Sequence, residues 1–123
     1  MIDYAEAQLA CETYIRSLQA SDVETLLALF DDSATIEDPV GTELREGKSA
    51  LREFYSVACE GVLSAALSGA PRLAGNEVAF PFTVTAGTPG EELTISIIDV
   101  FKFNEAGKVI SMRAFWGPNN IAS

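Results

Sequence analysis

Four side chains in this sequence, Tyr14, Asp38, Tyr55 and Asp99, are of types that move protons or stabilise negative charge. Asp99 lies in the segment ELTISIIDVFKF over residues 92–103, which alternates like a β-strand. The face that it shares is otherwise apolar and consists of Leu93, Ile95, Ile97, Phe101 and Phe103. We expect this face to point into the core or a pocket, where an unpaired carboxylate is costly. Burial raises the pKa of a carboxyl group, so Asp99 either keeps its proton as a donor or reaches water or a backbone donor at the strand end.

Asp38 is the second acid with an unusual position. It ends the alternating segment ATIED over residues 34–38, and it shares a face with Ala34 and Ile36. Pro39 and Gly41 follow and predict a loop. A carboxylate at this point fits the mouth of a pocket, and it equally fits an ordinary solvated turn.

Tyr14 and Tyr55 each lie on the apolar face of a predicted helix. A buried phenol needs a partner for its hydroxyl, and each tyrosine is a candidate partner for the other; simple core packing is the alternative. Together the four residues suggest enolisation. A neutral Asp99 and a tyrosine suit a carbonyl oxygen that gains charge, and an ionised Asp38 suits removal of a proton beside that carbonyl.

The elements that must position these residues follow from periodicity. Three helices are predicted. The first covers residues 4–20 and the third covers residues 49–60. The second begins at a Ser21–Glu24 capping box and has an apolar face that ends at Phe30. Asp31, Asp32 and Ser33 are expected to end the second helix. Strands are predicted at 34–38, 62–74 with an interruption near Gly69, 77–86, 92–103 and 108–116. Short connections between the later strands predict antiparallel pairing, and the order of elements predicts an α+β domain with helices covering one concave face of the sheet.

Composition limits the classes of function. The chain has 123 residues, a net charge of -10 and 48% hydrophobic residues, so we expect a single domain over 1–123 with its own core. The negative charge opposes binding to nucleic acid or an anionic membrane. Histidine is absent from the sequence, and Cys11 and Cys59 have no metal-site spacing, so neither a metal nor a cofactor is expected. Without a basic leader or a long apolar run, the expected location is the cytoplasm.

Three segments of the sequence carry a resemblance: YIRSLQASDVETLLALFDDSATIEDPVG, ALREFY and SIIDVFKFNEAGKVISMRAFWGPNN. They resemble bacterial ketosteroid Δ5-isomerases, from about Tyr4 to Ile121 in one register, most weakly over 61–76. The resemblance implies a conical NTF2-like fold, related to SnoaL-like proteins, with a curved, mostly antiparallel sheet and helices closing a deep apolar pocket. It also implies a homodimer that converts 3-oxo-Δ5-steroids to their Δ4 isomers through a dienolate, without a cofactor.

The resemblance also implies roles for the candidate residues. Asp38 matches the base that moves a proton from C4 to C6 of the steroid. Tyr14 and a protonated Asp99 match the two oxyanion donors, and the neutral acid is a known feature of that family rather than an independent prediction. Tyr55 matches the tyrosine that hydrogen-bonds the catalytic one, and Phe30 stands where some members have a further network tyrosine. The expected pocket lining, from position and resemblance, is Leu18, Val40, Phe54, Phe82, Val84, Met112, Ala114 and Trp116.

Two other functions stay open at this point. An NTF2-like domain can bind an apolar ligand without catalysis, because fold alone does not settle function. A polyketide cyclase of the SnoaL type, acting on a different enolisable ketone, is the other alternative. The joint presence of Tyr14, Asp38 and Asp99 favours the isomerase, since a binding pocket does not need a base and two donors.

Overall fold

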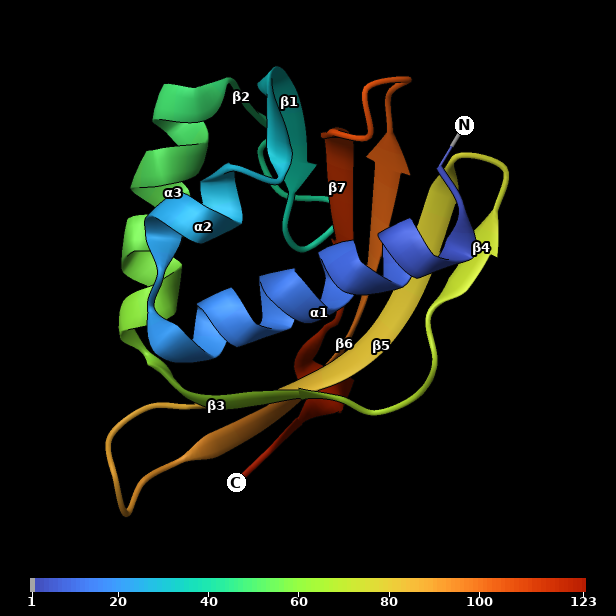
Figure 1. Ribbon diagram of the computed structural model, residues 1–123. Helices are drawn as coiled ribbons and strands as arrows, with labels where there is room; N and C mark the ends of the chain where they lie inside the picture. Colours follow the sequence, from blue (N-terminus) through green and yellow to red (C-terminus); the bar gives the residue numbers. More distant parts are fainter. Residues whose placement is uncertain (1) are drawn as a thin grey trace.

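The computed structural model describes residues 2–123 of the chain. Its helices pack against one side of a curved sheet (Figure 1). The described residues form the α-helices α1 (Tyr4–Ala20), α2 (Val23–Leu27) and α3 (Lys48–Glu60), and the 3-10 helix η1 (Pro118–Asn120). Their strands are β1 (Phe30–Glu37), β2 (Arg45–Glu46), β3 (Val62–Leu67), β4 (Arg72–Ala74), β5 (Glu77–Ala86), β6 (Leu93–Phe103), β7 (Val109–Phe115) and β8 (Ile121–Ala122). The predicted α+β class is therefore confirmed.

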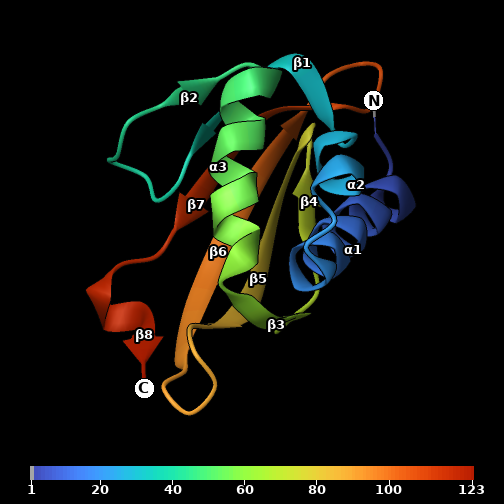
Figure 2. The ribbon, with the colours of Figure 1, turned by 90° about the vertical axis from the view of Figure 1, so that its left-hand side faces the viewer.

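The sheet has the strand order β2-β1-β7-β6-β5-β3, with β4 added to β5 and β8 added to β6. β3, β5, β6 and β7 pair antiparallel, as their short connections predicted. β1 pairs with β7 in parallel. Most of the chain separates these two strands, so no hairpin constrains their direction. Figure 2 shows α3 crossing in front of the sheet, with α1 and α2 beside it.

The second helix departs from the prediction. Its N-cap is Asp22, whose carboxylate accepts from the Thr25 backbone N–H at 3.1 Å, and Ser21 instead ends α1 in the left-handed conformation with φ 55°. The predicted Ser21–Glu24 capping box is therefore wrong by one residue. The backbone N–H of Asp22 donates to the Ser17 carbonyl at 2.9 Å. This bond ends α1 in a Schellman motif, in which Ser21 is the left-handed residue.

The same helix is also shorter than predicted. It ends at Leu27, and Phe30 begins β1, where it pairs with Val109 and is only 2% exposed. Residues 31–33 lie inside β1 rather than at a helix end. The β1–β7 register shifts between Phe30 and Thr35, so this acidic stretch bulges outward to solvent. Pairing with a distant strand here outweighs a short helical pattern.

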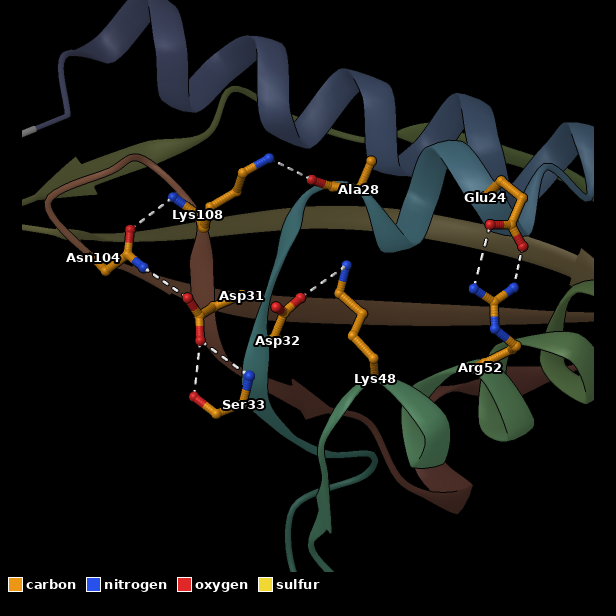
Figure 3. A network of polar contacts seen from close by, with 9 residues as sticks. All are labelled: Glu24, Ala28, Asp31, Asp32, Ser33, Lys48, Arg52, Asn104 and Lys108. Atoms are coloured by element: carbon orange, nitrogen blue, oxygen red, sulfur yellow. Dashed lines mark hydrogen bonds and ion pairs between the residues drawn. The ribbon is translucent and has the colours of Figure 1, made fainter.

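Several exposed charges form a polar network away from the sheet's core (Figure 3). Arg52 of α3 pairs with Glu24 of α2, and Lys108 Nζ donates to the Ala28 carbonyl at 2.8 Å. Asn104 reaches Asp31 at 3.3 Å. Such surface contacts each add little to the stability of the fold, which therefore depends mainly on the packing of the apolar interior.

The interior is a single cluster whose largest side chains are aromatic. Tyr14, Phe30, Phe80 and Phe101 are each no more than 2% exposed and belong to this cluster. Among residues 2–123, no helix is long and apolar enough to cross a membrane.

Candidate active site

The four side chains singled out in the sequence line one cavity. Tyr14 comes from α1, Asp38 from the loop after β1, Tyr55 from α3 and Asp99 from β6, and the cavity volume is about 240 Å³. Their positions span 85 residues of sequence, so only the packing of both helices onto the sheet brings them together. The structure thus assembles two carboxyl groups and two phenols around one mainly apolar space.

Tyr14 and Tyr55 are hydrogen-bonded to each other through their hydroxyls at 2.9 Å. Helical spacing turns each ring toward the sheet, and the Tyr14 ring packs edge-on against Phe101 with centroids 5.1 Å apart. Burial raises the pKa of both phenols well above 10, and for Tyr14 the neighbouring Tyr55, Asp99 and Asp38 add to the shift. Both hydroxyls are therefore protonated and can donate.

This hydrogen-bond chain is short. Phe30 lies beside Tyr55, with ring centroids 6.0 Å apart, and it has no hydroxyl to offer. Within the described part of the chain, the Tyr55 hydroxyl bonds only to Tyr14. When the Tyr55 O–H is the donor in this hydrogen bond, the Tyr14 O–H is free to donate a hydrogen bond into the cavity.

Asp99 is placed by the register of β6. It lies between Phe80 of β5 and Ala114 of β7, and its side-chain face becomes steadily more buried along the strand, from Leu93 at 42% exposed to Phe103 at 1%. Leu93 is therefore outside the core, contrary to expectation, because it lies at the open end of the strand. Asp99 lies where the cavity closes.

The Asp99 carboxyl group is buried and unpaired. It is 1% exposed, and neither of its oxygens has a hydrogen-bond partner among residues 2–123. Burial raises the pKa of Asp99 well above 3.8 and the charge of Asp38 raises it further, although the nearby Tyr14 hydroxyl opposes the shift. Both effects favour the neutral carboxylic acid, which is a hydrogen-bond donor. Since buried polar groups are normally satisfied, this donor indicates a role outside packing.

Asp38 has a different environment. Trp116 Nε1 donates to its Oδ1 at 2.8 Å, and the following loop is fixed to β7 by a bond from Val40 N–H to the Ala114 carbonyl at 2.8 Å. Burial raises the pKa of Asp38, whereas the Trp116 hydrogen bond and the positive charge of Arg45 lower it. The two carboxyl groups of the cavity are thus held differently, and Asp38 ionises more readily than Asp99.

The sequence analysis did not predict the hydrogen bond from Trp116 to Asp38 or the influence of Arg45 on Asp38. Trp116 was expected only as a wall, although an indole N–H at a partly buried position needs an acceptor, and that signal was available. Arg45 lies on a two-residue strand, which is too short for periodicity to reveal.

The predicted lining residues divide into two groups. Leu18, Phe54, Phe82, Val84 and Trp116 do line the cavity. Val40 and Ala114 instead line a neighbouring cavity of about 630 Å³, which shares Phe82, Ile97 and Trp116 with the first. Met112 lines neither, because it pairs with Phe101 and Ile36 and is completely buried in the core. Ile95 and Ile97 also line the cavity, as expected for the face that they share with Asp99. The other cavity residues, which the predicted lining did not include, are Ala58, Gly61, Val62 and Ala86.

Comparison with known proteins identifies the family. Residues 11–112 match the model of the SnoaL-like domain. A steroid Delta-isomerase of Nocardioides simplex is 34% identical over 95% of this chain and 94% of its own length. The epoxide hydrolase LasB of Streptomyces lasalocidi is 34% identical over 85% of this chain, which spans only 39% of LasB. The structure of the epoxide hydrolase/cyclase-like enzyme SalBIII, studied for pyran ring formation in salinomycin, superposes with a TM-score of 0.88 at 29% identity, covering 99% of this chain and 98% of SalBIII. The sequence match, the superposition and the cavity agree, and the chain belongs to the SnoaL-like family.

Proposed function

We propose that this protein is a steroid Δ5-isomerase, which converts 3-oxo-Δ5-steroids to 3-oxo-Δ4-steroids. The observation that carries the proposal is the buried, unpartnered Asp99 carboxyl group in the same cavity as Asp38 and Tyr14. The similarity to a steroid Delta-isomerase over nearly the full length of both chains supports it. The cavity's mainly apolar lining suits a rigid apolar substrate.

In the proposed mechanism, Asp38 takes a proton from C4 of the steroid, and the C3 carbonyl becomes a dienolate oxygen. Tyr14 and neutral Asp99 donate hydrogen bonds to that oxygen, where the negative charge develops. Asp38 then returns the proton to C6, and the double bond moves from C5–C6 to C4–C5. The proton that leaves C4 is the one that arrives at C6, so no other reactant is required.

The base is tested by Asp38→Asn. We expect kcat for 5-androstene-3,17-dione, followed by conjugated-enone absorbance, to fall by roughly 10²–10⁴-fold, the usual contribution of a general base. Binding of a phenolic steroid should persist, because the amide keeps the acceptor for Trp116. Asp32→Asn makes the same chemical change at an exposed position and is expected to leave kcat unaltered. Full turnover by Asp38→Asn would remove Asp38 from the proposed role.

Epoxide opening is a second candidate, because two similar proteins carry that activity in their names. Such a reaction needs an acid at the epoxide oxygen and a base at the attacking hydroxyl, and Asp99 and Asp38 fit these parts. The convergence of two donors, Tyr14 and Asp99, favours a carbonyl oxygen instead. If the steroid is bound without an enone signal, a ligand-binding role gains support; if it is not bound, an epoxide or polyketide substrate does.

We also propose that the protein acts as a homodimer, as the resemblance to ketosteroid isomerases implies. Ile98 and Phe115 are paired across β6 and β7 and are 48% and 43% exposed on the outer face of the sheet. Two adjacent large apolar side chains on one exposed sheet face support an interface there.

A further inference from the structure

We propose that Arg45 is a positioning residue that keeps Asp38 ionised and therefore ready to accept a proton. This inference rests on the proposed function, in which Asp38 is the base. It concerns a residue of β2 that does not itself line the cavity, and it therefore acts on the chemistry through Asp38.

The register of the β1–β2 pair places Arg45 near Asp38. Arg45 lies directly opposite Ile36, so the two side chains share one face of the sheet. Asp38 lies two residues beyond Ile36, and its side chain also reaches this inner side, where it lines the cavity. Diagonal neighbours on adjacent strands are about 7–8 Å apart, which is within reach of a long side chain.

Packing fixes the position of the guanidinium. It lies over the ring of Phe54, with Cζ 4.8 Å from the ring centroid, and Phe54 itself lines the cavity. Its Nη1 atom is buried and has no hydrogen-bond partner among residues 2–123. Because an arginine does not lose its proton in a protein, a fixed positive charge lies against a residue of the cavity wall.

The other groups that face Asp38 do not supply such a charge. Tyr14 of α1 and Tyr55 of α3 are uncharged, because their pKa values are raised well above 10. Asp99 of β6, whose pKa is also raised, carries no positive charge in either form. Trp116 at the end of β7 contributes a neutral hydrogen bond. Among these groups, Arg45 is therefore the one with a full positive charge, and this charge opposes the rise in the pKa of Asp38 that burial causes.

Nearby carboxylates do not cancel this effect. Glu37 points to the other side of β1, where it faces Arg113 at 3.5 Å and the Gly41 N–H. Glu43, Glu46 and Glu53 line an outer groove together with Arg45. These three glutamates are exposed, so water screens their charge, whereas Arg45 and Asp38 are both partly buried.

The test is the titration of the Asp38 carboxyl in Arg45→Gln. Removal of the positive charge destabilises the ionised form, so Asp38 should take up its proton at a higher pH than in the unaltered protein. ¹³C NMR of carboxyl-labelled protein follows this directly and without substrate, with Asp38→Asn assigning the signal. In the steroid assay, kcat/KM of Arg45→Gln should fall roughly 3–10-fold at about pH 5 and less than about 2-fold at about pH 8.

Three further variants separate charge from packing. Arg45→Lys keeps the charge and should restore the titration and the pH profile. Arg45→Met keeps the apolar stem over Phe54, and it gives the same readout as Arg45→Gln if that variant does not fold. Arg113→Gln removes a cation from the other side of β1 and should leave the Asp38 titration unaltered.

An unchanged Asp38 titration in Arg45→Gln and Arg45→Met would overturn the inference. So would an equal loss of kcat/KM at every pH, since that result indicates packing alone. A shifted titration in a protein that isomerises no steroid would retain the link between Arg45 and Asp38 and reject the proposed function.

Discussion

At the scale of single residues, the proposed chemistry depends on a difference between Asp38 and Asp99. Both are aspartates, yet Asp38 receives a hydrogen bond from Trp116 and Asp99 receives none. Burial raises the pKa of both groups, and the pKa of Asp99 is shifted further because it is more deeply buried and because the charge of Asp38 adds to the shift. In the proposed mechanism, one cavity therefore takes a base and a neutral donor from the same residue type.

The state of Asp99 predicts a pH dependence of stability. Its pKa is higher in the folded protein than in the unfolded chain, so the unfolded state alone ionises as the pH rises above about 4, and this contribution to stability declines until the folded pKa is reached. Asp99→Asn cannot ionise in either state. Its deficit in the free energy of unfolding, relative to the unaltered protein, should therefore shrink between about pH 4 and about pH 7.

Urea unfolding at several pH values measures this difference. Asp32→Asn, which removes an exposed carboxylate, controls for the general effect of net charge. A deficit of Asp99→Asn that stays constant with pH would mean that Asp99 is ionised in the folded protein. That result would also remove the neutral donor from the proposed mechanism.

At the scale of elements, the end of α3 determines how wide the cavity opens. Gly61 follows α3 and lines the cavity together with Ala58, so two small residues stand at its mouth. Gly61 has an ordinary φ of -87°, and a Cβ built there meets no atom within 4 Å. A side chain at this position is therefore compatible with the backbone and reduces the open space.

The series Gly61→Ala, Gly61→Val and Gly61→Leu tests the width of this mouth. We expect KM to rise with side-chain size for steroids that have a bulky substituent far from the reacting ketone, and to change little for those without one. The midpoint temperature of thermal unfolding should be almost unchanged across the series, because a Cβ at Gly61 meets no atom within 4 Å. Equal effects on both substrate types would show that Gly61 does not face the bound substrate.

The elements also show how far local pattern reaches. α1, α3, β5, β6 and β7 were predicted within one or two residues, because each has a long run of regular periodicity. The second helix was predicted too long, and β2 and β8 were not predicted. Residues 30–33 and β8 are arranged by pairing with β7 and β6, which are distant in the sequence, and β2 has only two residues, too few for a periodic pattern.

At the scale of the whole molecule, the outer face of the curved sheet is the feature without a partner. We expect the protein to sediment as a dimer in analytical ultracentrifugation, and Ile98→Glu or Phe115→Glu to shift it toward monomer, because each places a charge in a proposed apolar interface. Val57→Glu makes a comparable change on α3, at a side chain that is 70% exposed, and should not alter the mass. A monomer at high protein concentration would contradict the proposal.

The sequence by itself determined the regular elements, the α+β class and the apolar setting of Asp99, because each depends on residues that are neighbours in the chain. It also identified the four side chains that the structure places around one cavity. The tertiary structure decided the bond from Trp116 to Asp38, the approach of Arg45, the unpaired state of Asp99 and the removal of Met112 from the cavity. These depend on strand register and on contacts between distant segments, and they are fixed only once helices and sheet pack together.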